Sequence, residues 1–194
     1  MTAPAGPLDT VGNALRVLRR HWRPAYLAAL AATLVNTVPD VVRQVLVWDD
    51  PRFGSAVLVD VIGFGTGLLA QLWVTGAVAA LPAGGGLAPA GALRRGAGSA
   101  WRAVRTAPGT VLTGVVVGGG VSALLTLPPS IAALGPDRVL GPLDEPGVGA
   151  FAVAALSDVV ASAVTLPFLA LVLVLVATGH RSAARGLTAS GPGQ

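Results

Sequence analysis

The sequence predicts an all-α integral membrane protein with four transmembrane helices, arranged as two similar hairpin halves that each follow a basic amphipathic interfacial helix. Of the 194 residues, 53% are hydrophobic and only 11% are charged, and the mean hydropathy of +0.72 exceeds what a water-soluble domain needs for its core. Four stretches of about 20 mostly apolar residues are each long enough to cross a hydrocarbon core of about 30 Å as a helix. Arginines flank one end of these stretches. The composition excludes a disordered chain and argues against a soluble enzyme.

Two short basic segments have the pattern of amphipathic helices. After residues 1–10, which we expect to be disordered, apolar residues recur at helical spacing while arginines occupy the other faces. In the first segment this stripe is Val11, Leu15, Leu18 and Trp22, and in the second it is Leu93, Ala97, Trp101 and Val104. Asp9 or Thr10 can cap the first helix. We expect both helices to lie in the membrane interface.

The four predicted spans differ in how clearly they read as transmembrane helices. They cover residues 25–47, 56–81 and 109–134, and a fourth ends at Thr178. Helices are required, because lipid offers no hydrogen-bond partner to backbone groups and four segments cannot close a barrel. The first span is the weakest, because Pro39, Asp40 and Arg43 interrupt its outer third, although Asp40 and Arg43 are spaced to pair on one helical face.

The distribution of arginine predicts the orientation. Ten of the 13 arginines lie beside one end of the spans. They are Arg16, Arg19, Arg20 and Arg23 before the first span, Arg94, Arg95, Arg102 and Arg105 between the second and third, and Arg181 and Arg185 after the fourth. Cationic loops stay in the cytoplasm. The sequence therefore predicts a multi-pass protein of a bacterial cell membrane with both termini in the cytoplasm.

The eight arginines of the two amphipathic segments have two interpretations. They could bind anionic lipid headgroups, each contributing about 1 kcal/mol near a charged leaflet. Alternatively, they only anchor and orient the protein, because the positive-inside rule alone accounts for them. In either case we expect anionic membrane lipids as partners, with a membrane protein or a second copy as further candidates. Because the charges are few and most arginines lie beside the ends of the predicted spans, they do not indicate that the protein binds nucleic acid.

A weak internal repeat divides the predicted membrane domain, residues 11–178, into halves of about 11–86 and 87–178. The segment 14–19 aligns with 100–105 at a shift of 86, Pro39 with Pro128 at a shift of 89, and Asp60 with Asp158 at a shift of 98. An internal duplication explains these matches, and so does the arrangement of basic segments, spans and loops that membrane proteins commonly share. Residues 179–194 are expected to form a disordered cytoplasmic tail.

Small and polar residues within the spans predict how the helices pack. Gly63 and Gly67 in the second span and Gly114 and Gly118 in the third would let backbones approach closely. We therefore expect the second and third helices to pack together. Gln71 lies deeper than the other polar residues and is expected to form an interhelical hydrogen bond.

The sequence offers few residues that could bind an ion or take part in catalysis. Asp60 and Asp158 are candidates for an ion or proton site, because an ionisable group inside a span is costly and suggests function. However, residues 61–80 and 159–178 are each long enough to span without either carboxylate, which would place both at the outer boundary. With no cysteine and only His21 and His180, the sequence predicts no metal site, no other cofactor and no catalytic residues. We therefore do not expect an enzyme.

The run Leu15-Arg16-Val17-Leu18-Arg19-Arg20-His21-Trp22-Arg23 and the segment 90–105 carry a family resemblance. Over about residues 11–127, the chain resembles uncharacterised bacterial multi-pass membrane proteins related to the membrane domain of glycerophosphoryl diester phosphodiesterases. It differs in having four predicted spans where that group commonly has more, and it has no phosphodiesterase catalytic domain. The resemblance implies a membrane-embedded module with accessory or lipid-associated duties, and it transfers no catalytic residue.

The sequence thus favours a non-enzymatic multi-pass membrane module with an accessory, lipid-associated or partner-binding role. Two alternatives stay open. A small transporter or permease subunit would use Asp60 and Asp158 across a shared aqueous cavity. A phospholipid-active membrane enzyme would need a cluster of acid, base or metal-binding residues.

Overall fold

The computed structural model describes residues 6–46, 53–135 and 147–189, and within these ranges the regular structure is entirely helical. The elements are α1 (Pro7–Arg20), α2 (Trp22–Leu46), α3 (Phe53–Ala77), the 3-10 turn η1 (Leu81–Ala83), α4 (Ala92–Thr106), α5 (Pro108–Leu134) and α7 (Val148–Ala189). The all-α prediction is confirmed for the described residues.

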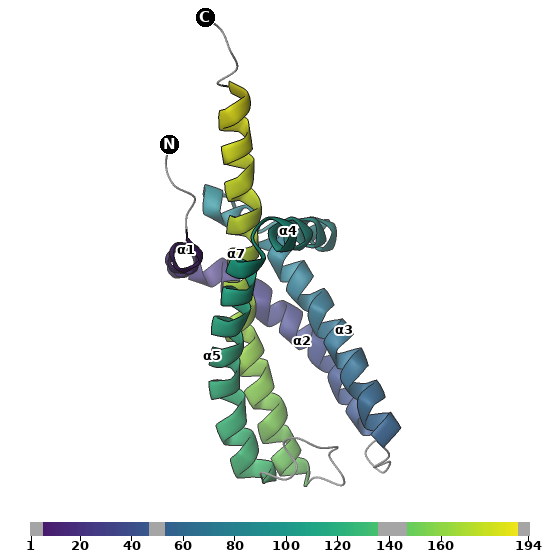
Figure 1. The fold of residues 1–194 in the computed structure, drawn as a ribbon. Coiled ribbons are helices and arrows are strands. Elements are labelled where there is room, and N and C mark those ends of the chain that lie inside the picture. The colour runs from purple at the N-terminus through teal and green to yellow at the C-terminus, as the bar shows by residue number, and fades with distance from the viewer. Residues whose placement is uncertain (1–5, 47–52, 136–146, 190–194) are drawn as a thin grey trace, which may run out of the picture.

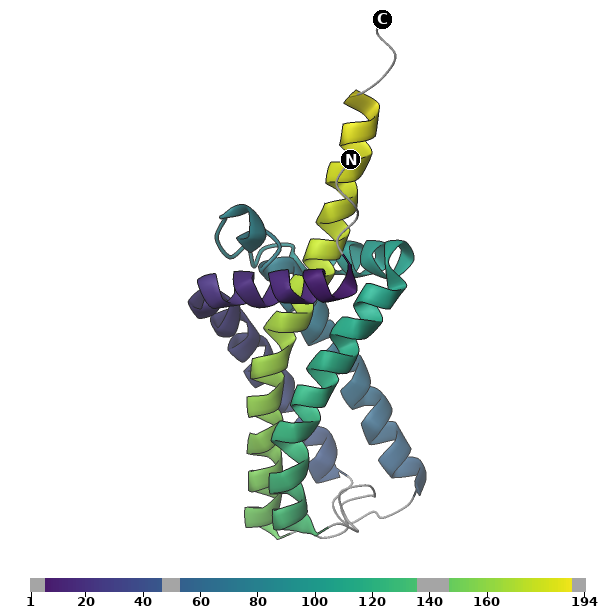
Figure 2. The same ribbon diagram turned by 60° about the vertical axis from the view of Figure 1, so that its left-hand side comes forward.

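The long helices α2, α3, α5 and α7 extend away from one end of the molecule, and the two short amphipathic helices lie across that end (Figure 1). α1 and α4 are at the same end of the molecule, on either side of α7. α5 and α7 run side by side, and α2 packs against α3 as a second pair (Figures 1 and 2). The two pairs diverge away from the α1 and α4 end, and α7 continues past that end toward the carboxyl terminus.

Three helical segments of the described chain are long and apolar enough to cross a membrane. They are Val61–Ala83, Pro108–Leu134 and Val148–Gly179. α2 is as long as α3, at 25 residues, but it is not among the three. Pro39, Asp40 and Arg43 all lie within α2, so the features that weaken this span in the sequence sit in one continuous helix.

The buried core lies close to α1 and α4. The largest fully buried side chains include Val74, Val78, Leu81, Leu171, Val172 and Val174, from the end of α3, the turn after it and the middle of α7. Far from α1 and α4, large apolar side chains are exposed, for example Leu124 and Val148, each 77% exposed. Lipid provides no hydrophobic force between helices. An exposed apolar surface of this kind is therefore stable in a bilayer and would not be in water.

A close helix contact joins α3 to α4 through two glycines. A Cβ atom built on Gly76 would lie 1.8 Å from the carbonyl oxygen of Ala92, and one on Gly96 would lie 1.7 Å from the carbonyl oxygen of Leu72. Only hydrogen fits between these backbones. This contact fixes α4 across the end of α3, and neither glycine was singled out by the sequence analysis.

α5 packs along α7 and not along α3, so the predicted pairing of the second and third spans is wrong. A Cβ atom on Gly114 would lie 2.9 Å from Cγ1 of Val172, and one on Gly118 would lie 3.7 Å from Cδ1 of Phe168. A Cβ atom on Gly67 would meet nothing within 4 Å. The glycines of α5 do mediate close packing, but their partner is the helix that follows them.

The ends of the described helices differ from those expected. α1 begins at Pro7, within the segment predicted to be disordered, because Asp9 accepts a hydrogen bond from the backbone N–H of Gly6 at 3.1 Å. A carboxylate in the first turn also interacts favourably with the helix dipole. α7 continues to Ala189, beyond the expected end at Thr178 and into the predicted disordered tail.

Candidate membrane-interface site

α1 presents one buried face and one exposed basic face. Val11, Ala14 and Leu18 are buried against the core, whereas Arg16, Arg19 and Arg20 are exposed. The predicted apolar stripe is therefore divided between two environments. Val11 and Leu18 face the protein, while Leu15 and Trp22 are 51% and 54% exposed and are available to lipid.

α4 buries a face of small residues: Ala92, Gly96, Ser99 and Ala103. The predicted stripe of α4 is instead largely exposed, since Leu93, Trp101 and Val104 are 43%, 59% and 49% exposed. α4 thus contacts the other helices through its small residues and presents its large apolar side chains outward.

The buried positions of α1 and α4 refine the internal repeat. Gly96, Ser99 and Ala103 match Val11, Ala14 and Leu18 at a constant difference of 85 residues, whereas the sequence alignment used 86. A difference of one residue rotates a helix by about 100°. The alignment on arginines therefore does not superimpose the faces that pack against the core.

Two arginines stack on tryptophans beside them. The guanidinium carbon of Arg23 lies 5.3 Å from the ring centroid of Trp22, and that of Arg105 lies 4.2 Å from the centroid of Trp101. Cation–π pairs at exposed sites contribute about 0.5–1 kcal/mol. Stacking leaves the N–H donors at the edge of the guanidinium free to bind an acceptor. Each amphipathic segment thus carries an amphipathic aromatic–cation pair of the kind found at membrane interfaces.

The eight candidate headgroup-binding arginines are not equivalent. Arg16, Arg19, Arg20, Arg23, Arg94 and Arg105 are exposed. Arg95 is half-buried and binds its own chain, donating to the carbonyl oxygens of Gly76 at 3.3 Å, of Ala90 at 2.6 Å and of Ala88. Arg95 therefore holds the turn after α3 in place. Only the glycine-rich turn, whose carbonyls lack helical partners, could have suggested this role from the sequence.

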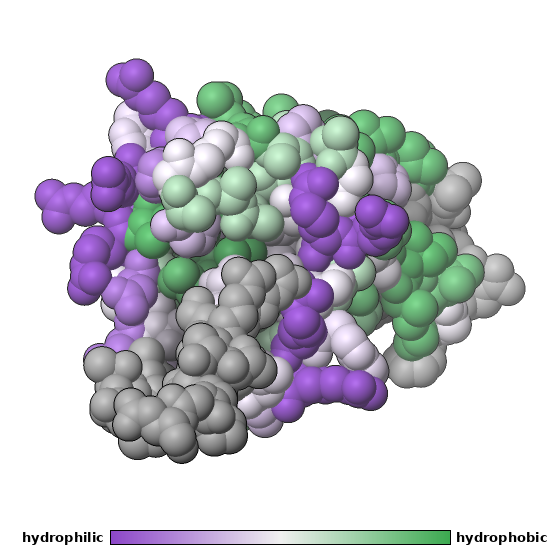
Figure 3. All heavy atoms as spheres, turned by 90° about the horizontal axis from the view of Figure 1, so that it is seen from above, coloured by the Kyte–Doolittle hydropathy of each residue, from purple (hydrophilic) through white to green (hydrophobic). Residues whose placement is uncertain are grey.

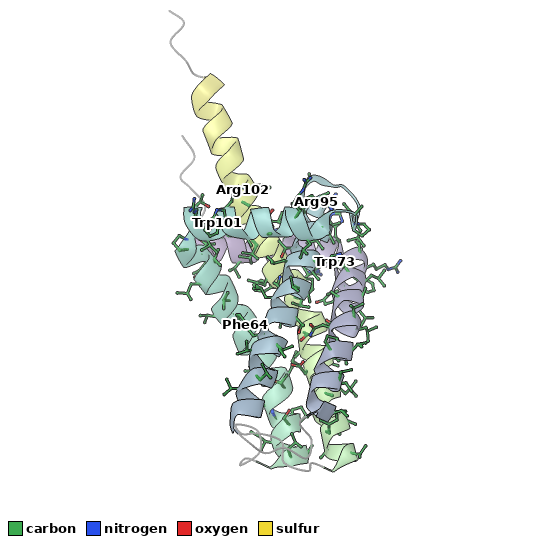
Figure 4. All side chains as sticks on the ribbon, turned by 90° about the vertical axis from the view of Figure 1, so that its right-hand side faces the viewer. Phe64, Trp73, Arg95, Trp101 and Arg102 are labelled. Carbon is green, nitrogen blue, oxygen red and sulfur yellow. The ribbon has the colours of Figure 1, made fainter. Side chains whose placement is uncertain are left out.

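Arg102 is the second half-buried arginine of α4. Its NH2 group donates to Oγ of Ser99 at 3.4 Å, and its Nε is buried without a hydrogen-bond partner among the described residues. Figure 4 places Arg102 and Arg95 at separate points along α4, with Trp101 beside Arg102. Arg95 and Arg102 are thus half-buried and bonded within the chain, whereas the other six arginines are exposed.

Viewed from above, hydrophilic side chains form two groups on this face, one on the α1 side and one over α4 (Figure 3). The only carboxylate within α1 and α4 is Asp9, which caps α1. No acidic side chain in these two helices therefore neutralises the exposed arginines. We call α1, α4 and Arg23 the basic layer.

An apolar groove opens between α2 and α3 beneath α4, with a volume of about 570 Å³. It is lined by Ala31, Ala32, Val35, Asn36 and Pro39 of α2, by Thr66, Leu69, Ala70 and Trp73 of α3, and by Leu93 of α4. Figure 4 shows Trp73 beneath α4, whereas Phe64 lies further along α3. The sequence analysis did not predict this groove, because it depends on the spacing between two helices.

The two candidate ion-site carboxylates lie on different helices. Asp60 is in α3, immediately before the apolar segment Val61–Ala83, and its side chain lies outside the described part. Asp158 is exposed on α7, 21 residues before Gly179, where the apolar segment of that helix ends. The side chains of Asp40 and Arg43, the predicted ion pair, also lie outside the described part.

The prediction for Gln71 is confirmed. Its Nε2 donates to the carbonyl oxygen of Leu166 on α7 at 3.3 Å and to Oγ1 of Thr75 at 3.3 Å. This bond joins α3 to α7 next to Pro167, a proline inside α7. Within the described residues, no group of three or more His, Cys, Asp or Glu side chains could hold a metal ion.

No protein-family model, curated protein or solved structure matches the chain. Over residues 6–46, 53–135 and 147–189 the structure defines the class: a helical membrane protein with three segments suited to cross a bilayer.

Proposed function

We propose that this chain is a non-enzymatic, multi-pass module of a bacterial cell membrane whose basic layer binds anionic lipid headgroups. The observation that carries the proposal is the common placement of α1 and α4 across one end of the long helices (Figures 1 and 2). Both helices bury one face in the core, and six arginines of the basic layer are exposed. Phosphate groups are the natural partners of exposed guanidinium groups in a membrane interface.

The proposal includes four crossings, with α2 as the fourth. α2 has 25 residues, which gives a length of about 37 Å, enough for a hydrocarbon core of about 30 Å. It starts beside α1 and runs alongside α3 (Figure 2). With α2 across the membrane, both termini are on the side of the basic layer, which the positive-inside rule assigns to the cytoplasm.

Lipid retention measured by native mass spectrometry tests the headgroup proposal. We expect the protein, extracted from membranes that contain both lipids, to retain phosphatidylglycerol in preference to phosphatidylcholine. Replacing the six exposed arginines by glutamine should abolish the preference. Replacing the same six by lysine should keep most of it, because the attraction is largely electrostatic. Equal retention of the two lipids by the wild-type protein would contradict the proposal.

A further inference from the structure

The groove between α2 and α3 opens toward lipid and is bounded by the basic layer. Val35 and Leu69 line it and are 73% and 52% exposed, so it is continuous with the lipid-facing surface. From Ala31 to Pro39 it extends about 12 Å along α2, at 1.5 Å per residue. Its volume of about 570 Å³ is within the range of sites that bind small molecules.

The chemistry of the walls selects a hydrocarbon. Apart from the indole N–H of Trp73, the polar side chains among the lining residues are those of Asn36 and Thr66. The hydroxyl of Thr66 donates to the carbonyl oxygen of Gly63 at 3.1 Å, and Asn36 is already engaged in an interaction of its own. A polar ligand would lose its hydration in this groove without compensating hydrogen bonds.

The α4 side of the groove selects the charge of the headgroup. Leu93 is the lining residue that α4 contributes, and the next residue along α4 is the exposed Arg94. Arg95 is committed to the turn after α3, so Arg94 is the cation of α4 that is adjacent to the groove in sequence and exposed. A lipid whose chain lies in the groove has its headgroup at the level of α4, where a phosphate can meet this guanidinium.

We propose that the groove holds one acyl chain of an anionic phospholipid and that Arg94 binds the phosphate of the same molecule. This inference rests on the proposed function, since it assigns a defined site to one of the lipids that the basic layer attracts. The inference adds one lipid bound at a fixed position to the general electrostatic attraction between the basic layer and anionic lipids. Trp73 and Leu69 form the α3 wall against which the chain packs.

Photo-crosslinking tests the site. The probes are phosphatidylglycerol and phosphatidylcholine, each with a photoactivatable group in one acyl chain, incorporated with the full-length protein into vesicles. Adducts of the phosphatidylglycerol probe are expected within residues 31–39 and 66–73. Leu69→Trp, which fills the groove, should lower the yield there by about fivefold or more. Leu68→Trp is the matched control: Leu68 is 48% exposed on the same helix but does not line the groove, so its yield should stay near wild type.

The headgroup arm uses Arg94→Gln and, as control, the charge-conserving Arg94→Lys. Arg94→Gln should reduce adducts of the phosphatidylglycerol probe in the groove and leave those of the phosphatidylcholine probe unchanged, whereas Arg94→Lys should keep most of both, because the attraction is largely electrostatic. If both probes label the groove equally in the wild type, the assignment to an anionic lipid is overturned.

The test separates this inference from the proposed function. If the protein retains phosphatidylglycerol selectively but Leu69→Trp leaves the adducts unchanged, the proposed function stands and the groove inference fails. If the groove is unlabelled and the purified protein is a dimer whose interface contains residues 31–39, a second copy fills the groove, which also overturns the inference. Loss of headgroup selectivity in the wild type would overturn both.

Discussion

The two long-helix pairs differ in how closely their members approach. α5 lies against α7 through Gly114 and Gly118. α2 and α3 leave a groove of about 570 Å³ between them. At the shift of 89 residues that relates Pro39 to Pro128, Gly114 and Gly118 correspond to Ala25 and Ala29, and all four positions are buried. A glycine removes the methyl group that would hold two backbones apart.

Side-chain size also differs between corresponding positions of α3 and α7. At the shift of 98 residues that relates Asp60 to Asp158, Trp73 corresponds to Leu171. Trp73 lines the groove, whereas Leu171 is fully buried. The pair in which Gly114 and Gly118 meet Val172 and Phe168 is closed, and the pair in which Trp73 lines the space between the helices is open. Because lipid does not force helices together, steric fit decides whether a pair closes or leaves space for a lipid chain.

The largest expected effect concerns the contact that positions α4 over the open pair. Gly96→Ala places a Cβ atom 1.7 Å from the carbonyl oxygen of Leu72, and backbone cannot move aside as a flexible side chain can. We expect a loss of about 3 kcal/mol or more in the free energy of unfolding. Thermal unfolding in detergent measures it. Gly98→Ala is the control, since its Cβ would meet only the end of Arg102 at 3.4 Å. Equal stability of the two variants would show that α4 does not rest on α3.

Gly114→Ala tests the closed pair. The new Cβ would lie 2.9 Å from Cγ1 of Val172, so the valine must move or the helices must separate. We expect destabilisation by about 1–3 kcal/mol, as for other overpacked sites. Gly120→Ala, where the Cβ would meet nothing within 4 Å, should be neutral or stabilising by up to about 1 kcal/mol. If Gly114→Ala behaves like Gly120→Ala in thermal unfolding, glycine is not the reason that the pair is closed.

Arg95→Gln tests whether the basic layer has a structural arginine. The substitution removes the guanidinium that donates to Gly76, Ala88 and Ala90, and hydrogen bonds from charged donors contribute about 1.5–3 kcal/mol. Because Arg95 is part-exposed, we expect a loss of about 1–2 kcal/mol. Limited proteolysis should cut the turn between α3 and α4 faster than in Arg94→Gln. Equal cleavage rates would remove the distinction between these two neighbours.

The smallest effect is expected at Asp158. Its side chain is exposed, and the helix from Asp158 to Gly179 is about 32 Å long, enough to cross a hydrocarbon core without including the carboxylate. Asp158→Asn should therefore change the free energy of unfolding by no more than about 0.5 kcal/mol. Infrared difference spectra of wild type and variant in lipid give the protonation state directly. A carboxyl of Asp158 still protonated at neutral pH would favour the transporter alternative.

The sequence predicts the helices better than their partners. Apolar length locates the segments that became α3, α5 and α7, because burial in lipid depends on composition along the chain. Helical spacing likewise locates the amphipathic α1 and α4. The partner of Gly114 could not be read in the same way, since a glycine marks a close approach without naming the helix that approaches.

The site shows the same limit at the level of single residues. Eight arginines look alike in the sequence, yet Arg95 bonds to backbone carbonyls and Arg23 and Arg105 stack on tryptophans. These roles depend on which carbonyl or ring lies within reach after folding. The groove depends on the distance between α2 and α3, which no local pattern specifies.

If α2 crosses the membrane, as we propose, α1 and α4 share the cytoplasmic face. The chain has no cysteine, so single cysteines can be placed without removing any. Gly12, Gly54 and Gly86 suit this purpose, because a Cβ atom at each meets nothing within 4 Å. A membrane-impermeant maleimide applied to intact cells should label Gly54→Cys alone, and Gly12→Cys and Gly86→Cys should react only after permeabilisation. Labelling of Gly12→Cys together with Gly54→Cys, or of neither before permeabilisation, would contradict the account, because α2 would then not cross.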